Sequence, residues 1–214
     1  SVQIVDGEEE ISGIRFTADT LASFTGLKKE VGKGAFLLPL PFVGSLADDE
    51  ANEKYGIIKV AMEAAADTID NRFMAWNMST WSHGAVLYVP DGIQLEDPVL
   101  LEYTDPVDGR LVNTQTLVIL GKGSHATVVQ RFAGTNSKKV LWNAGVTALI
   151  DDGARLSFTT NQHVSLDSIF VQNSTFRAGR DTVIEINEAS TGGGMVKTRS
   201  EVYLNGPGAD ARLN

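Results

Sequence analysis

A chain of 214 residues, 43% of them hydrophobic, is long enough to bury one substantial core. Its formal net charge of −9 and its lack of a lysine- or arginine-rich run argue against nucleic acid as a partner. No run approaches the ~20 apolar residues that span a bilayer, and the acidic first residues are unlike a signal peptide, so we expect a cytoplasmic protein. The sequence contains no cysteine, which excludes disulfides, a thiolate nucleophile and thiolate ligands for an iron–sulfur cluster.

Residues 1–80 are predicted to form an N-terminal segment that contains helices. The main helix is expected over 48–70, because acidic residues begin it and apolar residues recur at helical spacing. Those apolar residues are Ile57, Ile58, Ala61, Ala65 and Ile69. Shorter helices are expected over 18–27 and 71–78. The aromatic residues of the latter region, which we interpret as ordinary core packing, are Phe73, Trp76 and Trp81.

From about residue 83, short β-rich runs alternate with Gly, Asp, Asn and Pro. Five turn markers recur at intervals of 31, 30, 28 and 27 residues, namely Gly92, Gly123, Gly153, Asp181 and Gly208. Three positions after each marker stand Leu95, Ala126, Leu156, Ile184 and Ala211. Two positions further, the last four repeats have Val128, Phe158, Ile186 and Leu213, whereas the first has Asp97. This alternation predicts strands with one buried face.

Repeats of this length, each with two or more strands, indicate a β-solenoid. A single repeat cannot bury its own apolar face, but it can stack on its neighbours. We therefore predict a mainly β fold with a solenoid core over residues 81–214. A β-sandwich with coincidental spacing is the alternative that the residues leave open.

Candidate chemistry is sparse. The histidines, His83, His125 and His163, have no second ligand at a metal-binding spacing, although stacking in a solenoid could align them on one face. The glycine run at 192–194 lacks the Lys-Ser/Thr pair of a phosphate-binding loop, and no GxSxG nucleophile elbow is present. We therefore predict no catalytic residue, no metal site and no bound cofactor in this chain, and we expect that it is not an enzyme.

Several motifs over residues 70–214 follow one another in a specific order. A Trp-x-x-Gly element and a Val-Pro-x-Gly turn comprise Trp81, Gly84, Tyr88, Val89, Pro90, Gly92 and Pro98. Asp152-Gly153-Ala154, Gln162 and the run 197–209 follow. In this arrangement the sequence resembles the SufB/SufD family of iron–sulfur cluster assembly scaffolds.

The resemblance implies a right-handed parallel β-helix that pairs with a SufB/SufD paralogue and is served by a SufC-type ABC ATPase. The family's C-terminal helices, on which the ATPase docks, are missing here, so we expect a truncated piece with about half of the β-helix. An exposed coil end favours pairing with a second copy, and we expect a homodimer. An iron–sulfur cluster is expected only in the assembled complex.

Functional residues of the family transfer poorly. The Gln of a Gln-x-Trp element in SufB-type members maps to Gln162, but Val164 stands at the Trp position. No cysteine matches the family's sulfur route, and these departures favour a SufD-like paralogue, or an archaeal-type variant, over SufB itself. Gln162 and His163 are weak functional candidates, with a purely structural role as the alternative.

The predicted function is a noncatalytic scaffold subunit of a SUF-type iron–sulfur cluster assembly complex. A carbohydrate-active β-helix enzyme would need acidic residues clustered on one sheet. A structural or adhesive solenoid would be expected to carry a secretion signal. The sequence shows neither feature, and both functions remain as alternatives.

Overall fold

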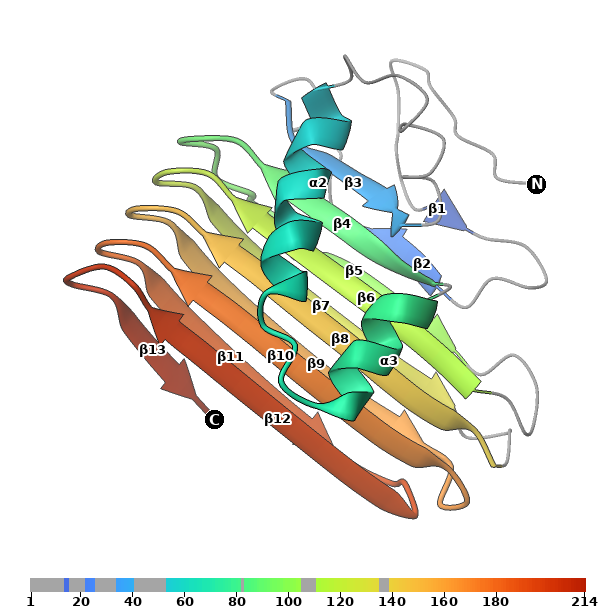
Figure 1. Ribbon diagram of the computed structural model, residues 1–214. Helices are drawn as coiled ribbons and strands as arrows, with labels where there is room; N and C mark the ends of the chain where they lie inside the picture. The colour runs from blue at the N-terminus through green and yellow to red at the C-terminus, as the bar shows by residue number, and fades with distance from the viewer. Residues whose placement is uncertain are drawn as a thin grey trace.

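The computed structural model describes residues 14–15, 22–25, 34–40, 53–81, 83–104, 111–134 and 139–214. Its strands form two sheets (Figure 1). Sheet A contains, in order, β1 (Ile14–Arg15), β2 (Ala22–Thr25), β5 (Val99–Thr104), β7 (His125–Gly134), β9 (Arg155–Val164), β11 (Val183–Ser190) and β13 (Asp210–Leu213). Sheet B contains, in order, β12 (Met195–Leu204), β10 (Ile169–Ala178), β8 (Leu141–Ile150), β6 (Leu111–Leu120), β4 (His83–Val89) and β3 (Phe36–Pro39).

From β4 onward, consecutive strands belong to opposite sheets, and neighbours within each sheet are parallel and in register. The chain therefore winds as a solenoid, and the predicted mainly β solenoid is confirmed. At the N-terminal side, β3 pairs antiparallel with β4, and β2 pairs antiparallel with β5. Strands from the N-terminal segment thus extend both sheets beyond the first coil.

The five predicted turn markers all lie at one corner of the solenoid. Each has a positive φ, of 70°, 62°, 71°, 53° and 75° in chain order. The backbone N–H of each marker donates to the turn of the next coil where one follows, as from Gly92 to the Lys122 carbonyl at 2.7 Å and from Gly153 to the Arg180 carbonyl at 2.7 Å. Left-handed backbone at these positions explains the choice of Gly and Asp.

The main core lies between the two sheets. The predicted inward residues of the inner coils are buried, and Phe132 lies at the centre of an aromatic group. Its ring centroid lies 5.0 Å from that of Tyr103, 5.4 Å from Trp142 and 4.9 Å from Phe170. Leu213 departs from the prediction because it is 54% exposed on the outermost strand, where no described strand packs beyond it.

Two helices, α2 (Glu53–Ala66) and α3 (Arg72–Thr80), lie across the outer face of sheet B (Figure 1). Ile58 and Ala61 of α2 pack against this face in a second apolar cluster with Phe36, Leu40, Val86 and Leu117. The helix predicted over 48–70 is confirmed over 53–66, and residues 48–52 lie outside the described ranges. The prediction is wrong for residues 67–70, which form a turn and the link to α3. The helix predicted over 71–78 is confirmed as α3.

The short helix predicted over 18–27 is wrong where the structure describes it, because residues 22–25 form β2. Ser23 and Thr25 belong to the residue types that compete with helical hydrogen bonding or prefer strands. The free edge of β5 offers β2 a full set of backbone partners, with Phe24 opposite Leu101. A tertiary pairing has therefore overridden a weak local preference.

Candidate functional site

Gln162 and His163, the candidates from the sequence, are neighbours on β9 that point to opposite sides of sheet A. Gln162 is fully buried between the sheets. His163 is exposed, and its Nδ1 lies 3.1 Å from the carbonyl oxygen of Thr191 and 2.9 Å from the Thr191 hydroxyl. Because side chains alternate along a strand, the two residues do not share a site.

Gln162 has an unusual environment for a buried carboxamide. Its Oε1 and Nε2 are both buried, and neither has a hydrogen-bond partner among the described residues. Gly193 packs closely above it, since a Cβ built there would lie 3.4 Å from the Gln162 Nε2 and 2.6 Å from Cγ2 of Val196. Each unpaired buried polar atom costs about 1–3 kcal/mol. A buried polar group without a protein partner calls for an explanation, either a bound water or a functional role, and Gln162 remains a candidate.

Polar groups also meet between the sheets in the aromatic part of the core. The Thr116 hydroxyl donates to Oε1 of Gln130 at 2.7 Å, and the Tyr103 hydroxyl lies 3.0 Å from the same Thr116 oxygen. Burial raises the pKa of Tyr103 to about 12, against a smaller opposing effect of the Thr116 hydrogen bond. The phenol is therefore neutral at physiological pH and acts as a hydrogen-bond donor.

This polar chain continues toward the later coils. Nε2 of Gln130 reaches Oε1 of Gln172 at 3.5 Å, and Nε2 of Gln172 lies 3.3 Å from the Thr160 hydroxyl and 3.1 Å from the Ser174 hydroxyl. Beyond it, the Ser200 hydroxyl donates to the carboxylate of Glu188. These carboxamides and hydroxyls can position a polar group between the sheets.

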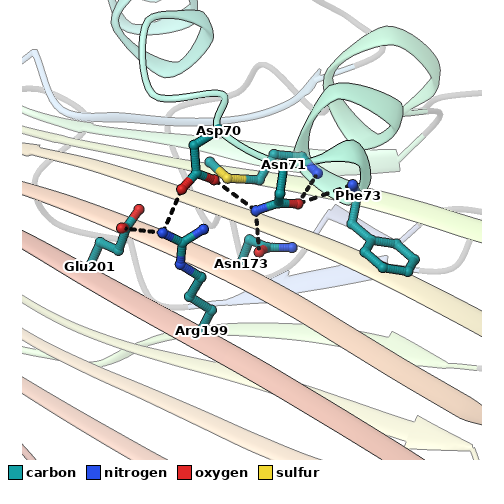
Figure 2. A network of polar contacts seen from close by, with 7 residues as sticks. Asp70, Asn71, Phe73, Asn173, Arg199 and Glu201 are labelled. Atoms are coloured by element: carbon teal, nitrogen blue, oxygen red, sulfur yellow. Dashed lines mark hydrogen bonds and ion pairs between the residues drawn. The ribbon is translucent and has the colours of Figure 1, made fainter.

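A second polar network joins the helices to sheet B (Figure 2). Asn71 caps α3, because its Oδ1 accepts from the backbone N–H groups of Phe73 and Met74, each at 3.0 Å. Its Nδ2 donates to Asp70 at 2.8 Å and to Oδ1 of Asn173 on β10 at 3.2 Å. One side chain thus both starts the helix and ties it to the sheet.

Arg199 on β12 completes this network. Its Nη2 lies 2.5 Å from Oδ2 of Asp70 and 2.6 Å from Oε1 of Glu201 (Figure 2). The hydrogen bond to Arg199 holds the pKa of Asp70 below its usual range, and the Asp70 hydrogen bond raises the pKa of Arg199. Nearby, the Lys197 ammonium lies 5.9 Å from the centre of the Phe73 ring. The network fastens the start of α3 to β10 and β12.

The sequence did not reveal this junction. Asp70 and Arg199 are far apart along the chain, and neither lies in a spacing that marks a site. The aromatic residues of α3 also differ from the prediction of core packing. Trp81 packs against the second apolar cluster, as predicted, but Trp76 is 37% exposed.

A groove of about 570 Å³ runs between α2 and the ends of the sheet B strands. Its apolar lining includes Ile57, Val60, Tyr88, Ile119 and Leu149. Charged residues stand at its margin. Arg177 lies over the Tyr203 ring at 6.0 Å, and Asp91 accepts a hydrogen bond from the Lys122 backbone at 2.8 Å. A groove of this size and polarity is suited to binding.

The three histidines do not align on one face. His83 begins β4 in sheet B, whereas His125 and His163 lie in sheet A at opposite ends of their strands, since His125 stands opposite Arg155 and His163 opposite Ala133. Within the described ranges, no three His, Cys, Asp or Glu residues are grouped so that they could hold a metal ion.

Residues 103–214 match the family model described as "SUF system FeS cluster assembly, SufBD core domain". Over an alignment of 130 residues, the chain is 25% identical to "Protein ABCI7, chloroplastic" of Arabidopsis thaliana, and the alignment covers 57% of this chain and 27% of that protein. Over 117 residues, the chain is 26% identical to an iron–sulfur cluster assembly SufBD family protein of Staphylococcus saprophyticus, and this alignment covers 54% of this chain and 25% of that protein. A Staphylococcus aureus SufBD family protein matches equally, at 26% identity over 117 residues. The chain spans about a quarter of the length of these relatives. No solved structure matches it.

Proposed function

Because the chain belongs to the SufBD core domain family of the SUF system for iron–sulfur cluster assembly, we propose that it is a noncatalytic scaffold subunit of such a complex. The family match over residues 103–214 carries the proposal. A rigid stack of in-register strands supports it, because such a stack holds a large surface in one shape for partners.

The proposal assigns the reacting groups to other subunits. This sequence has no cysteine and so no thiolate for sulfur or for a cluster. The unusual buried side chains described above are carboxamides and hydroxyls, and Arg199 is occupied by two carboxylates. In this account the iron–sulfur cluster is the cargo of the assembled complex, and no cofactor resides in this chain.

We propose two partners, a paralogue of the same fold and a SufC-type ABC ATPase that supplies the energy. The missing cysteine and the Val164 replacement make the chain more SufD-like than SufB-like. We also propose a cytoplasmic location. Neither of the described helices is long and apolar enough to cross a bilayer.

The test is affinity purification of the tagged protein from its own host, followed by mass spectrometry. An ABC-type ATPase and a SufB/SufD paralogue should co-purify in fixed ratio, and the pool of enzymes that need iron–sulfur clusters should lose activity when the gene is deleted. If neither partner is recovered and the cluster enzymes stay active, the scaffold function is refuted.

For the isolated 214-residue chain we propose a homodimer. The outermost strands β12 and β13 expose Met195, Leu204 and Leu213, at 48%, 51% and 54%, beside a backbone edge that no described strand covers. Multi-angle light scattering should give twice the chain mass at high concentration. The double substitution Leu204→Lys and Leu213→Lys should give the monomer mass. A monomer at every concentration in the unmodified chain would exclude this pairing.

A further inference from the structure

A small cavity lies where α2 and α3 meet the outer face of sheet B. Its volume, taken as the space open to the centre of a water-sized sphere, is about 20 Å³. On this measure one water molecule needs about 10–15 Å³. The polar residues that line the cavity are Thr68, Asn77, Gln115, Thr147 and Asn173. The cavity therefore has room for one water molecule and several groups that could hold it.

Asn77 of α3 points an unpaired acceptor at this place. Its side chain is 2% exposed, and its Nδ2 donates to the carbonyl oxygens of Thr114 at 2.9 Å and Asn143 at 2.6 Å. These two bonds fix the orientation of the carboxamide, because a flip would turn its oxygen toward both carbonyls. The Oδ1 of Asn77 is buried and has no partner among the described residues.

The position of this oxygen follows from Gly145, which also lines the cavity. A Cβ built on Gly145 would lie 2.7 Å from Oδ1 of Asn77 and 2.0 Å from Oε1 of Gln115. Both carboxamide oxygens therefore sit over the same Cα. Nε2 of Gln115 is directed away, toward the Thr147 hydroxyl at 3.2 Å. Of these two oxygens, Oδ1 of Asn77 is the buried acceptor that still needs a donor.

We propose that an ordered water molecule occupies this cavity and donates a hydrogen bond to Oδ1 of Asn77, with Gln115, Thr147 or Asn173 as its further partners. A metal cation is disfavoured, because no carboxylate lines the cavity and its other walls include Ala65, Met74 and Met78. Such walls would not replace the hydration shell of an ion. The water acts as a bridge between the helix layer and the solenoid, independently of the proposed function.

A crystal structure of the chain at high resolution, grown with thallium(I) acetate, tests the proposal. A single density peak within hydrogen-bonding distance of Asn77 Oδ1, without anomalous signal, is expected. An empty cavity overturns the proposal, and so does an anomalous peak, which would identify a monovalent cation site.

A pair of substitutions on α2 gives an independent test in solution. Ala65 is buried at the cavity, whereas Ala66 on the same helix is exposed, so Ala66→Val is the control for valine in α2. Ala65→Val should displace the water and leave Asn77 without a partner. A nuclear Overhauser effect between a bound water and the side-chain amide protons of Asn77 should therefore be seen in the unmodified chain and in Ala66→Val, and should be lost in Ala65→Val. If the unmodified chain shows no such effect, the proposal is overturned.

Discussion

Gly84 of the Trp-x-x-Gly element should be intolerant of even one added methyl group. It lies on β4 opposite Gln115 of β6 and has a φ of 153°. A Cβ there would lie 1.9 Å from the Gln115 backbone oxygen and 2.8 Å from Cδ1 of Leu40. The oxygen belongs to the strand ladder, so β4 and β6 would have to separate. Overpacking of this kind costs about 1–3 kcal/mol, and the unfavourable φ adds about 1–2 kcal/mol. We expect Gly84→Ala to destabilise the fold by about 3 kcal/mol or more.

Two other glycines provide matched controls. Gly92 has a φ of 70° but no atom within 4 Å of an added Cβ, so Gly92→Ala should cost only the conformational part, about 1 kcal/mol. Gly56 lies within α2 with the same open space, so Gly56→Ala should stabilise by about 0.5–1 kcal/mol. Urea unfolding followed by circular dichroism measures all three. If Gly84→Ala costs no more than Gly92→Ala, the steric account of this motif is incorrect.

Three further predictions concern the polar groups. Gln162→Met should stabilise the fold by about 1 kcal/mol or more in urea unfolding, because it removes unpaired buried atoms; a loss of stability would show that Gln162 has a partner. Arg199→Met should return the Asp70 pKa to its usual range in an NMR titration. Since that pKa is lowered in the folded state, the contribution of Asp70 to stability is complete above the ordinary carboxyl pKa and is lost as pH falls through the lowered value. An unchanged Asp70 titration would refute the ion pair. With a folded pKa of about 12, Tyr103 should titrate well above the ordinary range of a tyrosine. Its contribution is complete below the ordinary tyrosine pKa of ~10 and is lost as pH rises through about 12. Tyr103→Phe should abolish this late step in an ultraviolet titration, and persistence of the step would refute the assignment.

The solenoid could be predicted because its signal recurs. Turn chemistry repeats at the same place in every coil, and each marker has the left-handed backbone that Gly or Asp tolerates. The apolar residues after each marker keep to one strand face, and parallel stacking buries them. Local pattern and tertiary structure therefore agree, and the β-sandwich alternative is excluded by the parallel pairing within each sheet.

The polar sites could not be predicted in the same way. Asn77 and Gly145 gain their roles only when α3 lies across sheet B, and nothing in their local sequence signals that contact. Gln162 was selected through a resemblance, and only the fold shows that its amide is buried and unpaired while His163 faces outward. Long-range contacts between single polar residues leave no periodic trace in one sequence.

Both corners of the solenoid accommodate changes in length. At the corner of the turn markers, four residues connect β6 to β7, β8 to β9 and β10 to β11, whereas five (205–209) connect β12 to β13. At the opposite corner, six residues (105–110 and 135–140) connect β5 to β6 and β7 to β8, whereas four (165–168 and 191–194) connect β9 to β10 and β11 to β12. Despite the added residue, Ala211 and Leu213 of β13 stay opposite Ile184 and Ile186 of β11. The connections therefore absorb added residues while the strands keep their register, and an engineer who inserts a peptide tag can use the turns at either corner.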